Sequence, residues 1–350
     1  MNTGVGLILA DSYDGGNFWG LAKNRSMASV PILGKYRLID FEINHMCSNG
    51  ISNIIIGASH NYQSLMHHIG TGKYYDLDRK NAGLHLLTPY AHEKWGDGNI
   101  FRASLRMLNN LDAPYIIITL SNVITDLDYT KMLDFHVTHN ASITCLAVKG
   151  SGLQFNVNQK GRVTSISHKN VEDNSLGLAP VIIMDMNDYK RDVMGIDDDD
   201  IFSLLRQQIE QQDIFYYTTK HLKYDFIDTV KKYYDFSMRF LKSYNDMPNL
   251  QTRTRDVTPT EVLSTANIHN SLLADGSKIA GEINGSIIGN EVTVGKDTTV
   301  KDCIVFSECD IAEEVYLENC IIDKGVKISK GVKLIGEKDA PVVIEKSSVI

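Results

Sequence analysis

Three short segments of the chain have residue types that could bind a phosphate group or a metal ion. The first follows an apolar run, Val5 to Ala10, and contains two adjacent glycines, Gly15 and Gly16. Backbone amides beside glycines can approach a phosphate closely. The same segment also has Asp11 and Asp14, which place negative charge at that point. A glycine pair is equally typical of a surface turn, so this segment alone does not establish a phosphate site.

The second segment is the turn GKYRLID, which has two cations two residues apart, Lys35 and Arg37. Two cations at this spacing can grip one phosphate group. The structural alternative is that Arg37 pairs with Asp40 and fixes the start of the helix that follows. Both interpretations stay open at this point.

The third segment is the run of four aspartates at 197–200, which could be read as a metal cluster. Consecutive residues do not face one point, and the run precedes an amphipathic stretch from Ile201. We therefore expect the solvated N-terminus of a helix, where carboxylates are stabilised by the helix dipole.

Composition limits the kinds of partner. The 350 residues are 43% hydrophobic and 22% charged, as in a soluble globular protein with room for two domains. A net charge of −8 argues against nucleic acid or an anionic membrane as partner. There is no apolar run long enough to cross a membrane and no export signal, so we expect a cytoplasmic protein. Its dispersed cysteines predict reduced thiols and no disulfide or zinc site. They are Cys47, Cys145, Cys303, Cys309 and Cys320.

The first half of the chain alternates β-rich runs with helical patterns. The runs are VGLILA, NIIIG from Asn53, YIIITL from Tyr115 and ITCLAV from Ile143. This alternation predicts a Rossmann-like α/β domain with a parallel sheet covered on both faces. A helix is expected from Phe41, with Asp40 as its N-cap and Gly50 at its end. The loop after the first strand lies where such folds bind ligands.

The last part of the chain has a period of six residues instead. The expected inward residues are Ile288, Val294, Val300, Phe306, Ile311, Leu317, Ile322, Val326, Ile328, Val332 and Leu334. This period predicts a hexapeptide β-helix, with a plain β-sandwich as the alternative. We expect an α/β domain over 1–244, a linker over 245–265 and a left-handed β-helix over 266–350.

The run NRSMASVPILGKYRLIDF at 24–41 resembles the bacterial ADP-glucose pyrophosphorylases, the glucose-1-phosphate adenylyltransferases of glycogen synthesis. Their matching segment is N-R-A-K-P-A-V-P-F-G-G-K-Y-R-I-I-D-F. The runs HHIGTG from His67 and YYDFSMRFL from Tyr233 match further segments. The resemblance implies a nucleotidyltransferase domain followed by a left-handed β-helix.

The resemblance also implies four places where cations and magnesium ligands would stabilise the charge that develops on phosphoryl oxygens. Each is altered here. The arginine of the glycine-rich loop is Asn17, and the lysine of K-P-A-V-P is Met27. The two magnesium-binding aspartates are Asn122 and Phe226. The chain therefore has no predicted catalytic residue and no predicted cofactor, and magnesium is expected only if Asp228 serves as a substitute ligand.

Other ligand positions have also changed. Ser59 stands where the family has a base-binding glutamine, and the sugar pocket has Leu178 and Pro180. The sugar-phosphate lysine is kept as Lys169, although a solvated loop lysine is the alternative reading. Lys35 and Arg37 match the turn at which the family binds sugar-phosphate activators, so both are candidate effector ligands.

These residues favour a non-catalytic, regulatory subunit that associates with a catalytic ADP-glucose pyrophosphorylase subunit in a hetero- or homo-oligomer. The alternative is an active sugar-nucleotide pyrophosphorylase with relocated metal ligands, for which Asp228 discriminates. A hexapeptide acyltransferase is disfavoured because all 11 histidines lie at or before His269, so the coil lacks a histidine base.

Overall fold

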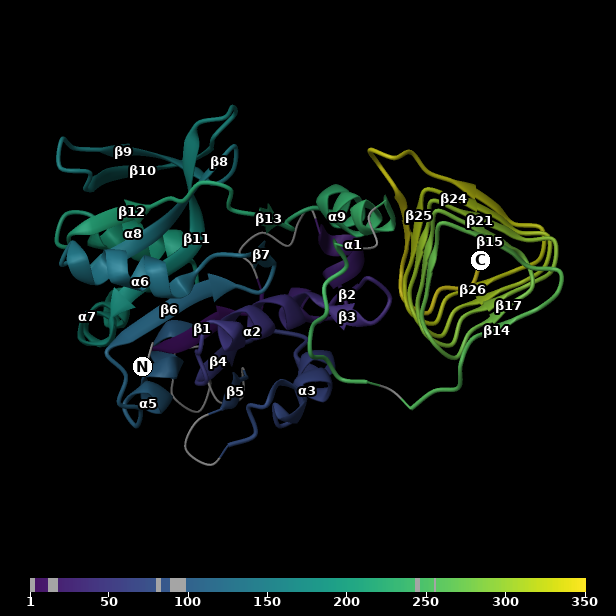
Figure 1. Ribbon diagram of the computed structural model, residues 1–350, viewed down its shortest axis with the longest axis horizontal. Helices are drawn as coiled ribbons and strands as arrows, with labels where there is room; N and C mark the ends of the chain where they lie inside the picture. The colour runs from purple at the N-terminus through teal and green to yellow at the C-terminus, as the bar shows by residue number, and fades with distance from the viewer. Residues whose placement is uncertain (1–3, 12–17, 80–82, 89–98, 243–245, 255) are drawn as a thin grey trace. The chain divides into compact units, whose positions relative to one another are not determined.

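The computed structural model describes residues 4–11, 18–79, 83–88, 99–242, 246–254 and 256–350 (Figure 1). Asn17 lies outside these residues. The chain divides into two compact units. The first comprises the described residues of 4–11 and 41–226, and the second comprises those of 18–40 and 227–350. Residues 18–40, which follow the first strand in sequence, thus belong with the C-terminal part of the chain.

Unit 1 is an α/β fold. Its described strands are β1 (Val5–Leu9), β4 (Ile54–Gly57), β5 (Leu84–Leu87), β6 (Tyr115–Leu120), β7 (Val123–Thr125), β8 (Ile143–Lys149), β9 (Leu153–Val157), β10 (Val163–Asn170), β11 (Leu176–Asp185), β12 (Ile214–Tyr217) and β13 (Tyr224–Phe226). Its described helices are α3 (Gln63–Ile69), η3 (Lys73–Tyr75), α5 (Ile100–Leu108), α6 (Tyr129–Thr138), α7 (Met186–Asp192), η4 (Val193–Gly195) and α8 (Ile201–Gln208), with α2 (Leu38–Ser48) crossing the boundary between the units. None of these described helices has the length and apolarity that a membrane span requires.

The main sheet has the strand order β10-β9-β11-β6-β1-β4-β5, and β8 and β12 extend it from β11. Strands β1, β4, β5 and β6 run parallel, as the buried apolar runs predict. The wholly parallel sheet was not a correct expectation, because β11 is antiparallel to both β6 and β8. Short apolar runs do not encode strand direction, and β11 lies between two of the predicted strands.

Helix α2 has capping groups at both ends. It begins three residues earlier than expected, so Asp40 lies inside its first turn and accepts a hydrogen bond from the backbone N–H of Arg37 (2.8 Å). This is the reciprocal half of a capping box. Gly50 has φ +78° and ends the helix, with its N–H bonded to the Cys47 carbonyl and that of Ile51 bonded to Met46. The predicted stop was therefore right, and Asp40 acts from a different capping position.

Unit 2 contains the predicted left-handed β-helix, which Figure 1 shows as stacked triangular coils. Three five-stranded parallel sheets form its sides. They are β14 (Glu261–Val262), β17 (Lys278–Ile279), β20 (Thr293–Val294), β23 (Asp310–Ile311) and β26 (Lys327–Ile328); β15 (Asn267–His269), β18 (Glu282–Asn284), β21 (Thr299–Lys301), β24 (Tyr316–Glu318) and β27 (Lys333–Ile335); and β16 (Leu272–Leu273), β19 (Ile287–Ile288), β22 (Ile304–Val305), β25 (Cys320–Ile322) and β28 (Val342–Ile344). Strand β14 lies inside the range expected to be linker, and the exact domain boundaries stay a prediction.

The coil interior is filled by the apolar residues that recur with the six-residue period. Ile288, Val294, Ile311 and Ile328 are all buried in this core. Phe306 is the exception. The side chain of its neighbour Val305 lies in the coil core instead, and Val305 pairs with Ile288 of the preceding coil. The spacing from Val300 to this inward residue is therefore five residues and not six.

The outer side of the third sheet is also apolar. Ile287, Ile304 and Ile321 point away from the coil core and yet are at most 1% exposed. They are covered by the remaining elements of unit 2, whose residues include Ile32 and Tyr233. Those elements are α1 (Trp19–Ala22), η2 (Met27–Ser29), β2 (Pro31–Ile32), β3 (Tyr36–Arg37) and α9 (Val230–Lys242). This buried ridge explains why residues 18–40 belong to the unit that contains the β-helix.

Candidate functional site

The candidate site of unit 1 lies at the carboxyl ends of three parallel strands. Strand β1 has β4 on one side and β6 on the other, which is the switch point where open α/β sheets bind ligands. The Ala10 N–H donates to the Gly57 carbonyl (2.7 Å), and the Ser121 hydroxyl donates to the Ala10 carbonyl (2.9 Å). These bonds fix the chain at the point where it leaves β1.

Asp11 is the first residue beyond this anchored point. Its Oδ2 accepts hydrogen bonds from the backbone N–H and from the hydroxyl of Ser59, each at 3.1 Å. Ser59 follows β4, and its Oγ lies 2.9 Å from Nδ1 of His60, which is itself 3.7 Å from the Asp11 carboxylate. The carboxylate, only 9% exposed, thus lies against polar groups at the end of the neighbouring strand.

Strands β7 and β13 bring the two expected metal-ligand positions together. Phe226 pairs with Val123, the residue that follows Asn122. Asn122 is fully buried and Phe226 is half-buried. An amide and a phenyl ring do not fit magnesium, which prefers carboxylate oxygens. Among the described residues, no group of three or more histidine, cysteine or acidic side chains is placed to hold a metal ion.

Asp228, the possible substitute ligand, belongs to unit 2 and forms an ion pair with Lys232 of α9 (2.7 Å). A lysine beside this carboxylate competes with a cation for it. Met27 also belongs to unit 2, where it begins η2 and is 3% exposed. A thioether in this place supplies no charge to a phosphate.

The GKYR turn has its two cations in different environments. The Lys35 ammonium lies 4.6 Å from the centre of the Tyr36 ring, in a cation–π arrangement. The Arg37 guanidinium donates to the Ser29 carbonyl. The backbone N–H of Arg37 donates to the Asp40 carboxylate (2.8 Å), which also accepts from the Thr252 hydroxyl (2.7 Å). Lys35 thus lies against an aromatic ring, whereas Arg37 bonds a backbone carbonyl.

Lys169 is exposed on β10, a strand of the main sheet in unit 1. The aspartate run at 197–200 caps two helices. Asp200 accepts from the first backbone N–H groups of α8, as expected, whereas Asp199 accepts from Ile100 at the start of α5 (2.6 Å). The aspartate run is therefore structural. The bond from Ile100 to Asp199 joins two segments that are 99 residues apart, so no pattern in the sequence indicates it.

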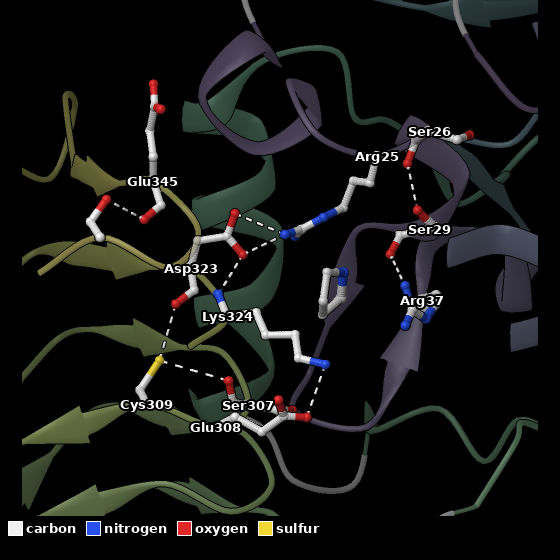
Figure 2. A network of polar contacts seen from close by, with 12 residues as sticks. Arg25, Ser26, Ser29, Arg37, Ser307, Glu308, Cys309, Asp323, Lys324 and Glu345 are labelled. Atoms are coloured by element: carbon white, nitrogen blue, oxygen red, sulfur yellow. Dashed lines mark hydrogen bonds and ion pairs between the residues drawn. The ribbon is translucent and has the colours of Figure 1, made fainter. Parts of the chain in front are cut away.

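Sequence reasoning missed a buried ion pair in unit 2 (Figure 2). The Arg25 guanidinium donates to both carboxylate oxygens of Asp323, at 2.7 and 2.9 Å, and both side chains are at most 5% exposed. The exposed pair of Lys23 and Glu345 lies in the same unit (2.8 Å). Arg25 stands in the run at 24–41, but its partner is 298 residues away, so no spacing pattern could reveal it.

Tyrosines of α9 complete the packing of unit 2. The Tyr233 hydroxyl donates to the Pro31 carbonyl and the Tyr234 hydroxyl donates to the Asp302 carbonyl, each at 2.6 Å. The Tyr233 ring also packs edge-on against Phe306. The run YYDFSMRFL is therefore structural in this chain, because its tyrosines attach α9 to residues 18–40 and to the β-helix.

Known proteins match both parts of the chain. A GlmU-like C-terminal hexapeptide family matches residues 257–341. A glucose-1-phosphate adenylyltransferase from Bacillus cytotoxicus is 26% identical over 97% of this chain and 96% of the relative. The corresponding enzyme of Bacillus subtilis is 28% identical, with the same coverage. The glycogen biosynthesis protein GlgD of Bacillus subtilis is 27% identical over 94% of this chain and 92% of the relative. The nucleotidyl transferase family matches residues 5–244, and the chain belongs to that family.

Proposed function

We propose that this chain is a non-catalytic, regulatory subunit of glucose-1-phosphate adenylyltransferase that acts in glycogen synthesis in the cytoplasm. It would associate with a catalytic subunit and change that subunit's activity. The observation that carries the proposal is the pairing of β7 with β13, in which Phe226 lies opposite Val123, the residue that follows Asn122. An amide and a phenyl ring thus stand at the two expected magnesium-ligand positions.

The chemistry explains why these positions matter. A sugar phosphate attacks the α-phosphate of ATP and pyrophosphate leaves, so negative charge develops on phosphoryl oxygens. Removing one preorganised donor from such a transition state typically costs about 10²–10³ in rate. Two cations and two metal ligands are replaced here, at Asn17, Met27, Asn122 and Phe226. Such losses are not additive, but turnover several decades below that of a catalytic relative is the expected result.

The comparisons support the pathway without choosing between the two roles. Relatives called glucose-1-phosphate adenylyltransferase and the relative called GlgD have nearly equal identity to this chain. The altered chemistry favours the regulatory role. Lys35 and Arg37, and also Lys169, remain proposed ligands of a sugar-phosphate effector or substrate.

The test is to assay the purified protein for ADP-glucose synthesis from ATP and glucose 1-phosphate with magnesium. A catalytic relative, such as the adenylyltransferase of Bacillus subtilis, is the positive control. We expect no measurable product from this chain. Magnesium-dependent turnover near 1 s⁻¹, which is ordinary for an enzyme, and its loss in Asp228→Ala would instead establish an active enzyme with relocated ligands.

A further inference from the structure

Two departures from the family pattern are bonded to each other in unit 1. Asp11 stands where the resemblance places the first glycine of the phosphate loop, and Ser59 stands where it places a base-binding glutamine. The Asp11 carboxylate accepts both the backbone N–H and the hydroxyl of Ser59, at 3.1 Å each. Neither substitution alone predicts this contact, because the two residues follow different strands.

The contact lies where a nucleotide would approach the sheet. Asp11 follows β1 and Ser59 follows β4, and the carboxyl ends of these parallel neighbours lie at one edge of the sheet. A backbone N–H at this edge is a donor that a ligand can use. In this chain the Asp11 carboxylate already accepts the backbone N–H of Ser59, together with the Ser59 hydroxyl.

The bonded carboxylate has two effects on an incoming nucleotide. It removes donors that a ligand would otherwise bind, and a ligand must replace those hydrogen bonds to displace it. It also fixes a negative charge at the edge of the sheet, where like charge repels phosphate. At 9% exposure the Asp11 side chain has little solvent around it to screen that charge.

We propose that Asp11 and Ser59 form an internal latch that excludes nucleotides from the carboxyl ends of β1 and β4. The proposal rests on the proposed function, since it assumes that this edge descends from a nucleotide pocket. It goes further by assigning the loss of nucleotide binding to a bonded pair of residues, separately from the loss of catalytic groups at Met27, Asn122 and Phe226.

The experiment measures ADP and adenosine binding by isothermal titration calorimetry. Wild-type protein is compared with Asp11→Gly, Asp11→Asn and the double variant Asp11→Gly/Ser59→Gln. Asp134→Asn, which removes an exposed carboxylate on α6 of the same unit, is the matched control. Thermal unfolding of each variant shows that it is folded, and Asp11→Ser replaces Asp11→Gly if the glycine variant does not fold.

We expect Asp11→Gly to bind ADP about tenfold more tightly than wild type or better, a change of about 1.4 kcal/mol, and the double variant to bind most tightly. Asp11→Asn keeps an oxygen that can accept the Ser59 N–H but loses the charge. It should therefore bind ADP more tightly than wild type and adenosine no more tightly. The control should match wild type with both ligands.

The latch proposal is wrong if the folded Asp11→Gly and Asp11→Asn variants bind ADP no more tightly than wild type, whether all three bind weakly or all three bind tightly. Either result leaves the regulatory proposal in place. Synthesis of ADP-glucose by the wild-type chain alone would overturn the proposed function itself, so the two failures are distinguishable.

Discussion

Phe226 on β13 pairs with Val123 on β7, the residue that directly follows the buried Asn122. The two positions are about 100 residues apart in sequence, and only the fold makes them neighbours. We expect that replacing both side chains by carboxylates gives a pair of oxygen ligands of the kind that magnesium and manganese prefer.

The first prediction follows from this proximity. Asn122→Asp/Phe226→Asp should bind Mn²⁺ saturably, as measured by electron paramagnetic resonance of free Mn²⁺, whereas wild type should not. Asn122→Asp alone is the control, because one carboxylate makes a poorer site. A folded double variant that leaves all Mn²⁺ free would show that these positions do not face one point.

The second prediction concerns the buried pair of Arg25 and Asp323. Asp323→Ala should lower the free energy of unfolding by about 3–5 kcal/mol, because it leaves a buried guanidinium uncompensated. Glu345→Ala removes the exposed partner of Lys23 and should cost about 1 kcal/mol or less. Urea unfolding, followed by the fluorescence of the tyrosines of unit 2, measures the free energy of unfolding of both variants. Equal losses in the two variants would mean that the Arg25 pair is not buried in solution.

The third prediction concerns pH. Burial lowers the pKa of His136 to about 4, and its Nδ1 lies 2.8 Å from the Thr144 hydroxyl. The folded protein therefore keeps this imidazole neutral while the unfolded chain protonates it near its usual pKa of about 6.5. The contribution of His136 to the free energy of unfolding is therefore fully present above about pH 6.5, and it is lost as the pH falls toward 4.

The variant His136→Gln should remove that contribution. Its melting temperature should lie below that of wild type at pH 7.5, and the difference should shrink as the pH falls toward 4.5. His139→Gln, which changes an exposed histidine at the C-terminal end of α6, is the control. A constant difference across this range would contradict the buried neutral imidazole.

The fourth prediction concerns the GKYR turn. In a mixture with a catalytic subunit, Lys35→Ala and Arg37→Ala should weaken the response to fructose 6-phosphate or fructose 1,6-bisphosphate while assembly is retained. Typical couplings of about 1–3 kcal/mol correspond to about 5–150-fold in affinity. Lys278→Ala, at an exposed lysine of β17, is the matched control. If both turn variants respond as wild type does, the turn is structural and Arg37 serves to hold the Ser29 carbonyl.

Much of the fold could be predicted because it depends on local patterns. The apolar runs at Tyr115 and Ile143 became β6 and β8, and Gly50 ended α2 as expected. The six-residue period identified the β-helix, although Phe306 was misplaced by one residue. Val305 lies inside the coil in its place, and the Phe306 ring packs against Tyr233 instead.

The site was harder to predict, because its contacts join residues that are far apart in sequence. The resemblance located Asn122 and Phe226 separately, but only strand pairing brings them together. Nothing in the spacing indicates that Asp11 bonds Ser59 or that Arg25 bonds Asp323. Asn17, the fourth altered position, lies outside the described residues, and its role stays a prediction.

The most direct test of the central claim is an ADP-glucose assay of this chain, of a catalytic relative and of their mixture, at matched protein concentrations and with sedimentation to follow assembly. We expect no product from this chain alone, a mixed oligomer, and a mixture more active than the catalytic subunit by itself. A mixture no more active than the catalytic subunit at every sugar-phosphate concentration, or turnover by this chain alone, would contradict it.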